Sequence, residues 1–430
     1  MPCDESTRDT GRNFGDRCAA RRTHHTAIFA LLLLAVGSCA QPETAPVPVA
    51  ESRDPDFRIG LLVNVRQATI GGDALRVEDP AEGDLRTVAA GSTLNVTFRG
   101  SAIALSGSGS RIERRALVIR PADSGGTMRL NGRTYRGTLE LRRGDSGVVV
   151  VNVVPLEQYL AGVVGTEMGA RAGDEIEALK AQAIVSRTYA IRNQGRWKDH
   201  GFDLVGTVND QAYGGALNEN VLATAAVAAT RGQILTWDNQ PIDAFYFSTC
   251  GGRTEDGTAA FAGASRPYLR SIEDRDPTGT PWCATSPRFH WTAGWTASQL
   301  ATTLRRTLPA EHLAVARAND LRDLRVIDRT ATGRIASLVL VGRNGRTVVA
   351  GQAMRRVLSP SDGGLLRSTD FTIRITRTGG KIERVDIDGR GNGHGVGMCQ
   401  WGAIGRARAG QDVATILTSY FPGTQVQRLY

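Results

Sequence analysis

The pattern of apolar and polar residues changes near residue 155. Between Phe57 and Val154 the two kinds alternate in short runs, separated by pairs such as Gly71-Gly72 and Asn131-Gly132. A period of two is typical of strands with one buried face, and Asn-Gly favours a tight hairpin. The pattern predicts strands at Arg58–Val65, Ala74–Val77, Thr93–Phe98, Ala116–Arg120, Thr138–Leu141 and Gly147–Val154.

Helical and strand patterns are mixed after this region. Asp174–Arg192 is the clearest helix, because Ile176–Ile191 lacks Gly and Pro and Asp174 with Glu177 forms a capping pattern. Further helices are predicted at Asn220–Thr230, Thr296–Leu308 and near Val413–Tyr420, and strands at Gln233–Trp237, Ala244–Phe247, Leu321–Ile327, Ile335–Val341, Phe371–Arg377, Glu383–Ile387 and after Pro422. We expect an α+β fold in which a β-rich region, residues 57–147, leads into a mixed α/β domain, residues 148–430, with a candidate insertion at 295–359.

The N-terminus has the pattern of an export signal. Arg21 and Arg22 precede the apolar run Ala27–Val36, which is too short to span a bilayer, and small residues then precede Cys39. This pattern resembles the lipobox of bacterial lipoproteins. It predicts a signal peptide at residues 1–38, lipidation of Cys39, a proline-rich linker at 39–56, and an exported lipoprotein anchored to the membrane in the cell envelope or periplasm. An ordinary cleaved signal peptide is the alternative.

The charge narrows the choice of partners. The full chain carries a formal charge of +9, and removal of residues 1–38 would leave +8. An exported basic protein can meet anionic lipid, a cell-wall polymer or nucleic acid. The chain has no dense Lys/Arg run interleaved with aromatic residues, so we do not expect it to bind nucleic acid.

Glu167 is a candidate general acid. It follows an apolar run that includes Val163 and Val164 and precedes a Gly-rich segment expected to form a loop. Apolar surroundings disfavour the charged form of a carboxyl group and raise its pKa, which suits proton donation near neutral pH. A solvated loop carboxylate is the alternative. On the next helix, Gln182, Ser186 and Tyr189 share one face, which either lines a cleft or faces solvent.

A second cluster of candidates lies in the glycine-rich run 391–405. Glycines at 391, 393, 395 and 397 allow positive φ and a close approach of the backbone to a ligand. His394 can hydrogen-bond a ligand oxygen, and Trp401 offers a flat face suited to a sugar ring. The alternatives are a glycine-shaped turn with a core Trp, or a thiol hydrolase that uses Cys399 with His394.

Three cysteines remain if Cys39 carries lipid. A Cys250–Cys283 disulfide would leave Cys399 free, as an oxidising compartment permits. The alternative is a metal site of all three thiolates with His290 or His394 as fourth ligand. Spacing alone leaves both open.

Six segments, in order, resemble the stage II sporulation protein D and amidase-enhancer family. They are VVPLEQYLAGVVGTEM, EALKAQAIVSRTYA, DQAYGG, FSTCGGRTE, SRPYLRSIED and GHGVGMCQWGA, and they cover most of residues 148–430. The resemblance implies a catalytic domain with a glycan cleft and a lytic transglycosylase that acts on peptidoglycan strands stripped of stem peptides. Glu167 would protonate the bond between N-acetylmuramic acid and N-acetylglucosamine, and the muramic 6-hydroxyl would close to a 1,6-anhydro end.

The resemblance also assigns supporting residues. It implies that the glycan site is lined or supported by Gln182, Ser186, Arg187, Tyr189, Gln211, Tyr213, His394, Gln400 and Trp401. It implies no required cofactor. Because some members hold zinc, it adds weight to a structural zinc at Cys250, Cys283 and Cys399. A cell-wall amidase is an implied partner, and a non-catalytic peptidoglycan-binding or amidase-enhancing protein is the rival function.

Two residues depart from the family pattern. Many relatives have His where this chain has Phe247, and many have Pro where it has Gly169. The second difference predicts a less constrained loop at Glu167.

Overall fold

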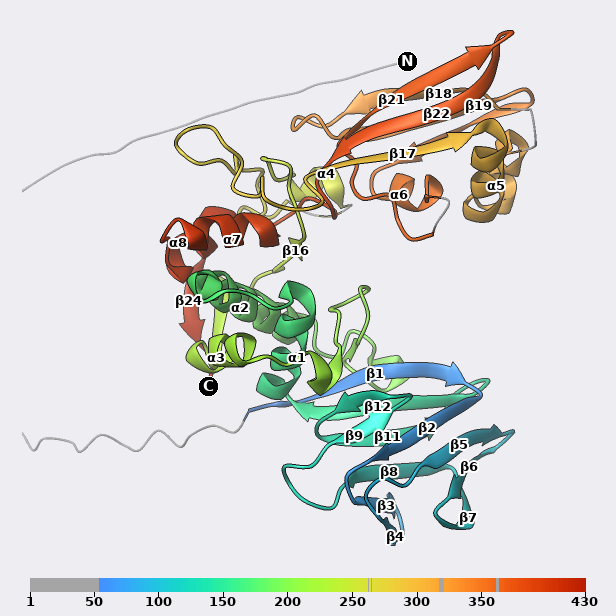
Figure 1. Cartoon of the computed structure of the whole chain (residues 1–430), viewed down its shortest axis with the longest axis vertical. Coiled ribbons are helices and arrows are strands. Elements are labelled where there is room, and N and C mark those ends of the chain that lie inside the picture. Colours follow the sequence, from blue (N-terminus) through green and yellow to red (C-terminus); the bar gives the residue numbers. More distant parts are fainter. Residues whose placement is uncertain (1–53, 262, 264, 317–320, 361–362) are drawn as a thin grey trace, which may run out of the picture. The chain divides into compact units, whose positions relative to one another are not determined.

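Two sheets form the first part of the described chain, and their strands are antiparallel except for the parallel pair of β1 and β13. The computed structural model describes residues 54–261, 263, 265–316, 321–360 and 363–430, which have a mixed α+β fold (Figure 1). The predicted signal peptide, Cys39 and most of the linker lie outside these residues. The seven-stranded sheet has the order β13-β1-β12-β11-β8-β3-β4 and the six-stranded sheet the order β10-β9-β2-β5-β6-β7. Their strands are β1 (Asp56–Val65), β2 (Gln67–Gly72), β3 (Leu75–Asp79), β4 (Gly83–Val88), β5 (Leu94–Arg99), β6 (Ala102–Gly107), β7 (Gly109–Arg114), β8 (Ala116–Pro121), β9 (Met128–Leu130), β10 (Arg133–Tyr135), β11 (Thr138–Arg143), β12 (Val148–Pro155) and β13 (Leu204–Val205).

The predicted strands of this region are confirmed, and several more are present. Asn131 and Gly132 have φ values of 48° and 83° and join β9 to β10, so the expected hairpin forms with the positive φ values that its turn requires. β12 reads VVVVNVVP and pairs with β1 on one side and β11 on the other. The predicted division at residues 147 and 148 therefore falls inside one sheet.

A helical layer follows β12 directly. α1 (Leu156–Met168), α2 (Ile176–Arg192) and α3 (Val221–Ala229) pack on one another, and α7 (Gln400–Arg408) and α8 (Val413–Tyr420) pack on α2 (Figure 1). Small residues such as Ala178, Ala181 and Ala183 are fully buried in α2 and permit this close packing. The apolar residues of the sheets and of these helices belong to one hydrophobic core.

The predicted cap of α2 is wrong. A 3₁₀ turn, η1 (Gly173–Glu175), precedes the helix, and the Glu175 carboxylate accepts the backbone N–H of Ala172 at 3.0 Å. Glu177 instead pairs with Lys180 and accepts the backbone N–H of Val413. The extra turn moves the start of the helix past Asp174, so the spacing read from the sequence does not apply. By contrast, α3 is capped by Asn220, as its predicted start implies.

Short elements connect the helical layer to the rest of the chain. β14 pairs with β15 and with the last strand, while β16 and β23 form a parallel pair. The elements are η2 (Lys198–His200), η3 (Gly215–Asn218), β14 (Gln233–Trp237), β15 (Gln240–Pro241), β16 (Tyr246–Phe247), α4 (Gly257–Ala260), β23 (Met398–Cys399) and β24 (Gln425–Arg428).

A second hydrophobic core is built from residues between Trp291 and Ile387, beyond both ends of the predicted insertion at 295–359. It contains the sheets β17-β22-β21 and β18-β19-β20, whose predicted pairs are confirmed, and the predicted helix α5, capped by Thr296. Its elements are β17 (His290–Thr296), α5 (Ala297–Thr307), η4 (Ala310–Ala316), β18 (Leu321–Arg329), β19 (Ile335–Gly342), β20 (Gly345–Ala350), α6 (Ala353–Val357), β21 (Phe371–Thr378) and β22 (Lys381–Arg390). None of the helices in the described part of the chain is long and apolar enough to cross a membrane.

Candidate active site

Glu167 lies in the last turn of α1, which corrects the expectation that it lies in a loop. The helix continues through Gly162 and Gly165 because these glycines pack against the loop that follows β13. A Cβ on Gly162 would lie 2.7 Å from the Tyr213 ring, and one on Gly165 would lie 1.9 Å from the Asn218 carbonyl oxygen. The helix ends only at Gly169, where φ is 68°. Gly162 and Gly165 therefore serve close packing, and the Gly-rich segment predicted as a loop begins only after the helix, at Gly169.

Three neutral donors hold the Glu167 carboxylate. Its Oε1 accepts the backbone N–H of Ala212 at 3.0 Å and the Tyr246 hydroxyl at 3.2 Å. Its Oε2 accepts the Gln400 amide at 3.4 Å. The carboxylate is thus held on both oxygens, which contradicts the expectation that Gly169 leaves it loosely placed.

Burial raises the pKa of Glu167 above its ordinary value. The donors from Ala212, Gln400 and Tyr246 oppose this shift because they stabilise the charged form, but burial has the larger effect. The side chain keeps some exposed surface, so a ligand can reach it. Burial also raises the pKa of Tyr246 well above its ordinary value, which keeps that hydroxyl protonated and able to donate. These properties are those of a general acid.

A buried amide network extends behind the acid. Gln400 donates to Gln182 Oε1 at 3.3 Å, and Gln182 donates to Ser186 at 2.9 Å. On the other side, Gln211 donates to the Tyr246 hydroxyl at 3.3 Å. Gln182, Ser186 and Gln211 have no exposed surface, so the stripe on α2 is not a solvent face. These side chains support the donors to Glu167 and do not themselves reach the surface.

The other predicted site residues have partners elsewhere. Arg187 is fully buried and donates two 2.7 Å hydrogen bonds to the Glu157 carboxylate. The Tyr189 hydroxyl donates to Asp210, and the Tyr213 hydroxyl donates to Asn152.

Both ring nitrogens of His394 bind the backbone. Nδ1 accepts the N–H of Val396 at 3.1 Å, so Nε2 carries the proton and donates to the Tyr246 carbonyl at 3.0 Å. Burial lowers the pKa of His394 to about 4, which keeps the ring neutral. Its role here is to hold the segment that carries Tyr246.

A pocket lies beside the acid, although Glu167 is not among its lining residues. It has a volume of about 270 Å³ and includes Thr166, next to Glu167, and Ala212, which donates to Glu167. The rest of its lining is Arg133, Gly206, Tyr213, Gly214, Leu217 and Asn218. The volume lies just below the range of pockets that bind drug-sized ligands, which suits a single sugar ring.

Trp401 stands beside Gln400 at the start of α7 and keeps a partly exposed ring. The Arg171 guanidinium lies over this ring, 5.0 Å from its centroid, and donates to the Met168 carbonyl at 2.5 Å. The ring therefore stays near the end of α1. Arg171 was not predicted, although its position four residues after Glu167 is visible in the sequence.

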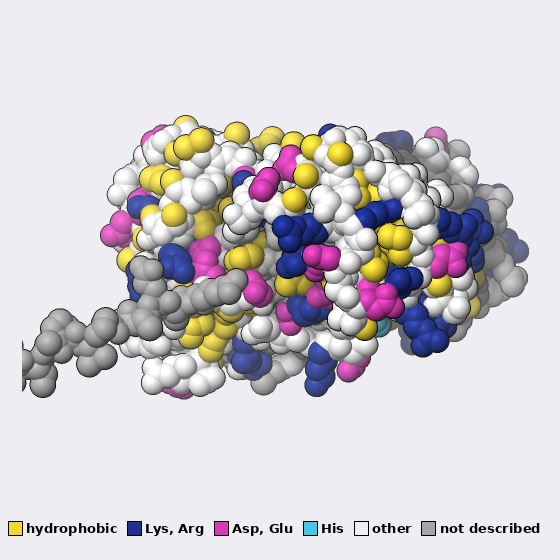
Figure 2. Space-filling view, turned by 90° about the horizontal axis from the view of Figure 1, so that it is seen from below, with side chains coloured by type: hydrophobic (Ala, Val, Ile, Leu, Met, Phe, Trp, Pro, Cys, Tyr) yellow, Lys and Arg dark blue, Asp and Glu magenta, His cyan; other side chains and the backbone are white. Residues whose placement is uncertain are grey.

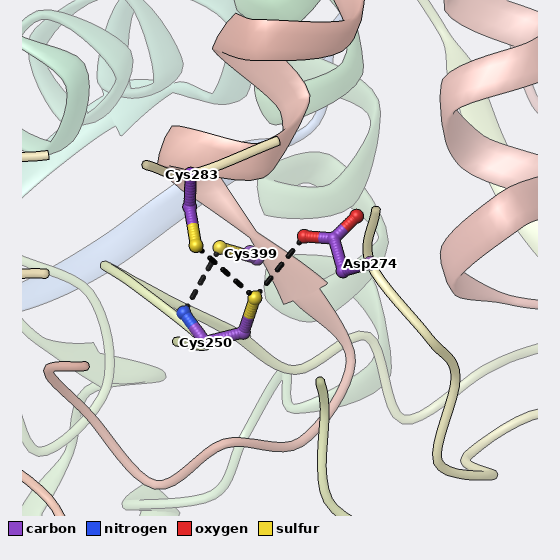
Figure 3. A group of neighbouring side chains, drawn as sticks. All are labelled: Cys250, Asp274, Cys283 and Cys399. Carbon is purple, nitrogen blue, oxygen red and sulfur yellow. Dashed lines mark hydrogen bonds between the residues drawn. The ribbon is translucent and has the colours of Figure 1, made fainter. Parts of the chain in front are cut away.

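The three cysteines converge in a second cluster, together with Asp274 (Figure 3). The thiols are free and buried, and the sulfur atoms of Cys250 and Cys283 are 3.4 Å apart, beyond the length of a disulfide bond. Asp274, at the end of the SRPYLRSIED segment, takes the place considered for His290 or His394. The Cys399 thiol has no exposed surface, and its hydrogen-bond partners are backbone groups and not His394, which argues against a thiol hydrolase.

Comparison with known proteins shows the family of the chain. A family model described as stage II sporulation protein matches residues 144–237, which include Glu167 and α2. Stage II sporulation protein D of Bacillus subtilis is 34% identical over 291 residues, covering 64% of this chain and 75% of the relative. The chain belongs to the stage II sporulation protein D family. The corresponding protein of Bacillus amyloliquefaciens is 32% identical over 291 residues, with 64% and 75% coverage.

Two further matches were found. The amidase enhancer of Bacillus subtilis is 30% identical over 299 residues, covering 62% of this family member and 40% of the relative. A model described as a domain of unknown function, DUF8618, matches residues 280–397, which contain the second core.

Proposed function

We propose that this protein is a lytic transglycosylase that cleaves N-acetylmuramic acid–N-acetylglucosamine bonds in peptidoglycan strands lacking stem peptides. Membership of the stage II sporulation protein D family supports a role at the cell wall. The observation that carries the proposal is the Glu167 carboxyl group, which has a raised pKa, three neutral donors and an adjoining pocket.

Glu167 would act first as acid and then as base. The protonated carboxyl group gives its proton to the glycosidic oxygen, and the bond from that oxygen to C1 of the muramic residue breaks. The muramic 6-hydroxyl then attacks C1, and the carboxylate takes the hydroxyl proton. The product is a 1,6-anhydro ring, no water is consumed, and Glu167 returns to its protonated form.

The three donors fit this cycle because they act on the charged state. When Glu167 loses its proton, Ala212, Tyr246 and Gln400 already point at the oxygens on which negative charge develops, so the site need not reorganise. None of them is a carboxylate. A transglycosylase needs one acid–base group, whereas most glycoside hydrolases need a carboxylate pair.

The decisive test is digestion of amidase-stripped glycan strands followed by mass spectrometry. We expect anhydro-muramic ends from the unaltered protein and a rate lower by about 10²- to 10⁴-fold for Glu167→Gln. Glu177→Gln is the matched control, because Glu177 lies on the neighbouring helix and pairs with Lys180. Reducing ends would refute the transglycosylase and indicate hydrolysis.

The match to an amidase enhancer supports a second candidate, a non-catalytic glycan-binding protein that assists a cell-wall amidase. Under that function, strands stay intact, strand binding persists, and Glu167→Gln changes nothing. Since the chain covers 40% of that relative, an amidase partner is a proposal that needs its own binding measurement.

We also propose export as a lipoprotein anchored through Cys39. The supporting pattern is the apolar run followed by small residues and Cys39. The unaltered protein should incorporate labelled fatty acid and sediment with membranes, and Cys39→Ala should abolish both. Labelling that survives this substitution would contradict the proposal.

A further inference from the structure

A positively charged side chain lies beside the candidate acid and belongs to none of the segments that carry the family resemblance. Arg171 follows the end of α1, between VVPLEQYLAGVVGTEM and EALKAQAIVSRTYA. Its side chain folds back along the helix end, so that Nε donates to the Met168 carbonyl at 2.5 Å. We propose that Arg171 binds the free lactyl carboxylate of a muramic residue and thereby selects strands without stem peptides. This inference rests on the proposed function.

The charge of Arg171 has no acid of its own. Within the part of the chain that the structure describes, Arg171 forms no ion pair, because the nearby Glu175 carboxylate is occupied by the Arg408 guanidinium and the Ala172 N–H. Burial lowers the pKa of Arg171, the Glu175 charge partly opposes this shift, and the Arg408 charge adds to it. A guanidinium stays protonated despite such a shift. A partly buried cation in these surroundings favours a bound anion.

Two contacts hold the guanidinium in one orientation. Its carbon lies 5.0 Å from the centroid of the Trp401 ring, and its Nε is bonded to the Met168 carbonyl. Neither Nη1 nor Nη2 has a hydrogen-bond partner among the described residues, and neither is buried. Two neighbouring N–H nitrogens match the two oxygens of a carboxylate. Because the stacked side chain is already ordered, binding costs less conformational entropy.

The two oxygens of Glu167 face two different neighbours. Oε1 accepts the N–H of Ala212, which lines the pocket, whereas Oε2 accepts the amide of Gln400, which precedes Trp401. A strand that leaves the pocket and crosses Glu167 would therefore place its next sugar near Trp401 and Arg171. No ion pair joins Arg171 to Glu167, whose pKa is set by burial and its three donors. The guanidinium thus remains available to the substrate.

The lactyl group is where the two kinds of strand differ chemically. Without a stem peptide it ends in a carboxylate, which offers a negative charge and two acceptor oxygens. With a stem peptide it is an amide, which offers one neutral acceptor and adds the bulk of the peptide. Hydrogen bonds between charged groups are stronger than those to neutral acceptors. Contact with Arg171 would therefore favour the stripped strand.

A second cation lies on the pocket side of the acid. Arg133 lines the pocket but occupies an exposed position of β10, where water and salt screen its charge. The Trp401 ring restrains Arg171, which is partly exposed, whereas no such stack holds Arg133 in the described residues. These differences assign the carboxylate to Arg171.

Binding of two matched strand preparations tests the proposal. One keeps its free lactyl carboxylates, and in the other these groups are converted to neutral N-methylamides. The full chain carries Glu167→Gln, so that strands stay uncut, and high salt screens long-range attraction between exposed charges. We expect the carboxylate strands to bind about five- to tenfold more tightly. Adding Arg171→Gln should reduce this preference to about twofold or less.

Three further variants separate a specific contact from a general charge effect. Arg231→Gln is the matched control, because it removes one charge from another arginine stacked on an aromatic ring, 5.8 Å from the Tyr430 centroid. It should keep the full preference. Arg171→Lys keeps the charge but loses the two-nitrogen fork, so we expect an intermediate preference of about threefold. Equal losses in Arg171→Gln and Arg231→Gln, or a loss in Arg133→Gln alone, would overturn the proposal.

The preference is a ratio of two affinities measured on the same protein sample, so partial unfolding of a variant does not alter it. The measurement also records binding and not cleavage. A preference that depends on Arg171, without anhydro ends from the unaltered protein, would support the carboxylate site and refute the transglycosylase. Anhydro ends formed at equal rates from both strand preparations would support the transglycosylase and overturn the selection by Arg171.

Discussion

The two hydrophobic cores differ in what they bury and in the charge around them. The first core encloses the polar network of Gln182, Gln211 and Gln400 behind Glu167, whereas the second is built on apolar side chains such as Trp295 and Leu340. Residues 290–397 contain 17 basic and 9 acidic side chains, a net charge of +8. The rest of the chain from residue 39 contains 30 of each.

The candidate catalytic residues and the net positive charge therefore lie in different parts of the sequence. Basic and acidic side chains are interspersed over the face shown in Figure 2. The pKa of Glu167 is raised by burial and lowered in part by its three neutral donors. Residues 290–397, which include the second core, account for the whole net charge of +8 of the predicted mature chain and contain none of the donors to Glu167.

The largest expected effect is on stability, at a buried ion pair of the first core. Arg187→Leu removes a fully buried guanidinium and leaves the Glu157 carboxylate, whose side chain is 12% exposed, without its cation. We expect a loss of about 3–5 kcal/mol in the free energy of unfolding, measured in urea. Arg111→Leu, which breaks an exposed pair with Glu113, is the control and should have little effect. Equal losses would mean that burial of the pair does not matter.

The second effect compares the same Leu→Ala substitution in the two cores. Leu160 in α1 and Leu340 in β19 are both fully buried. Each Leu→Ala change should cost about 2–5 kcal/mol in urea unfolding. Only Leu160→Ala should also slow strand cleavage per folded molecule, because α1 carries Glu167. If Leu340→Ala slowed cleavage as much, the two cores would not be functionally separate.

Periodicity alone predicts much of the fold but less of the site. The alternation before residue 155, the Asn131-Gly132 turn and the helix starts at Asn220 and Thr296 depend on local chemistry, and all are confirmed. The local sequence left Glu167 either in apolar surroundings or on a solvated loop. The contacts of Gly162 and Gly165 with Tyr213 and Asn218 show why the helix continues to Glu167.

The missed site residues share one physical cause. Tyr246 and the Ala212 amide lie 79 and 45 residues from Glu167 in the sequence, and Asp274 meets Cys250 and Cys399 only after folding. Arg187 was grouped with the glycan residues because the family resemblance includes it, but its side chain points to Glu157. A motif indicates which residues matter, whereas only packing shows which way each one faces.

A smaller effect concerns the pH dependence of strand cleavage by Glu167, which lies in the first core. Tyr246 donates to the charged form of Glu167 and thereby lowers the pKa of that group, so Tyr246→Phe should raise it. In the proposed mechanism Glu167 works when protonated, so the rate should fall as the pH rises through its pKa. The variant should therefore lose activity at a higher pH than the unaltered protein, with its maximal rate reduced by roughly tenfold or less.

The control for this shift is Tyr189→Phe, because the Tyr189 hydroxyl donates to Asp210 and not to Glu167. Rates of anhydro-end formation across the pH range would give both profiles. An alkaline limb that moves to lower pH in Tyr246→Phe would contradict the assignment of Tyr246 as a donor to the carboxylate.

The smallest expected effect tests whether the positive charge of residues 290–397 helps bind glycan strands. Strands without stem peptides carry a free lactyl carboxylate on each muramic residue, so they are polyanions that a basic surface attracts at low salt. Arg325, Arg346 and Arg374 are exposed on β18, β20 and β21. Changing all three to Gln lowers the net charge of residues 290–397 from +8 to +5.

We expect this triple variant to bind such strands about two- to fivefold more weakly at low salt, and equally well at high salt, where exposed charges are screened. Its maximal cleavage rate should stay unchanged, because none of the three residues contacts Glu167 or its donors. Arg99→Gln with Arg129→Gln, on the exposed surface of the first sheets, is the control and should alter binding less per charge removed. Equal effects per charge would show that the strand senses only the total charge of the protein. A larger effect in the second core would show that residues 290–397 carry the surface to which the anionic strand binds.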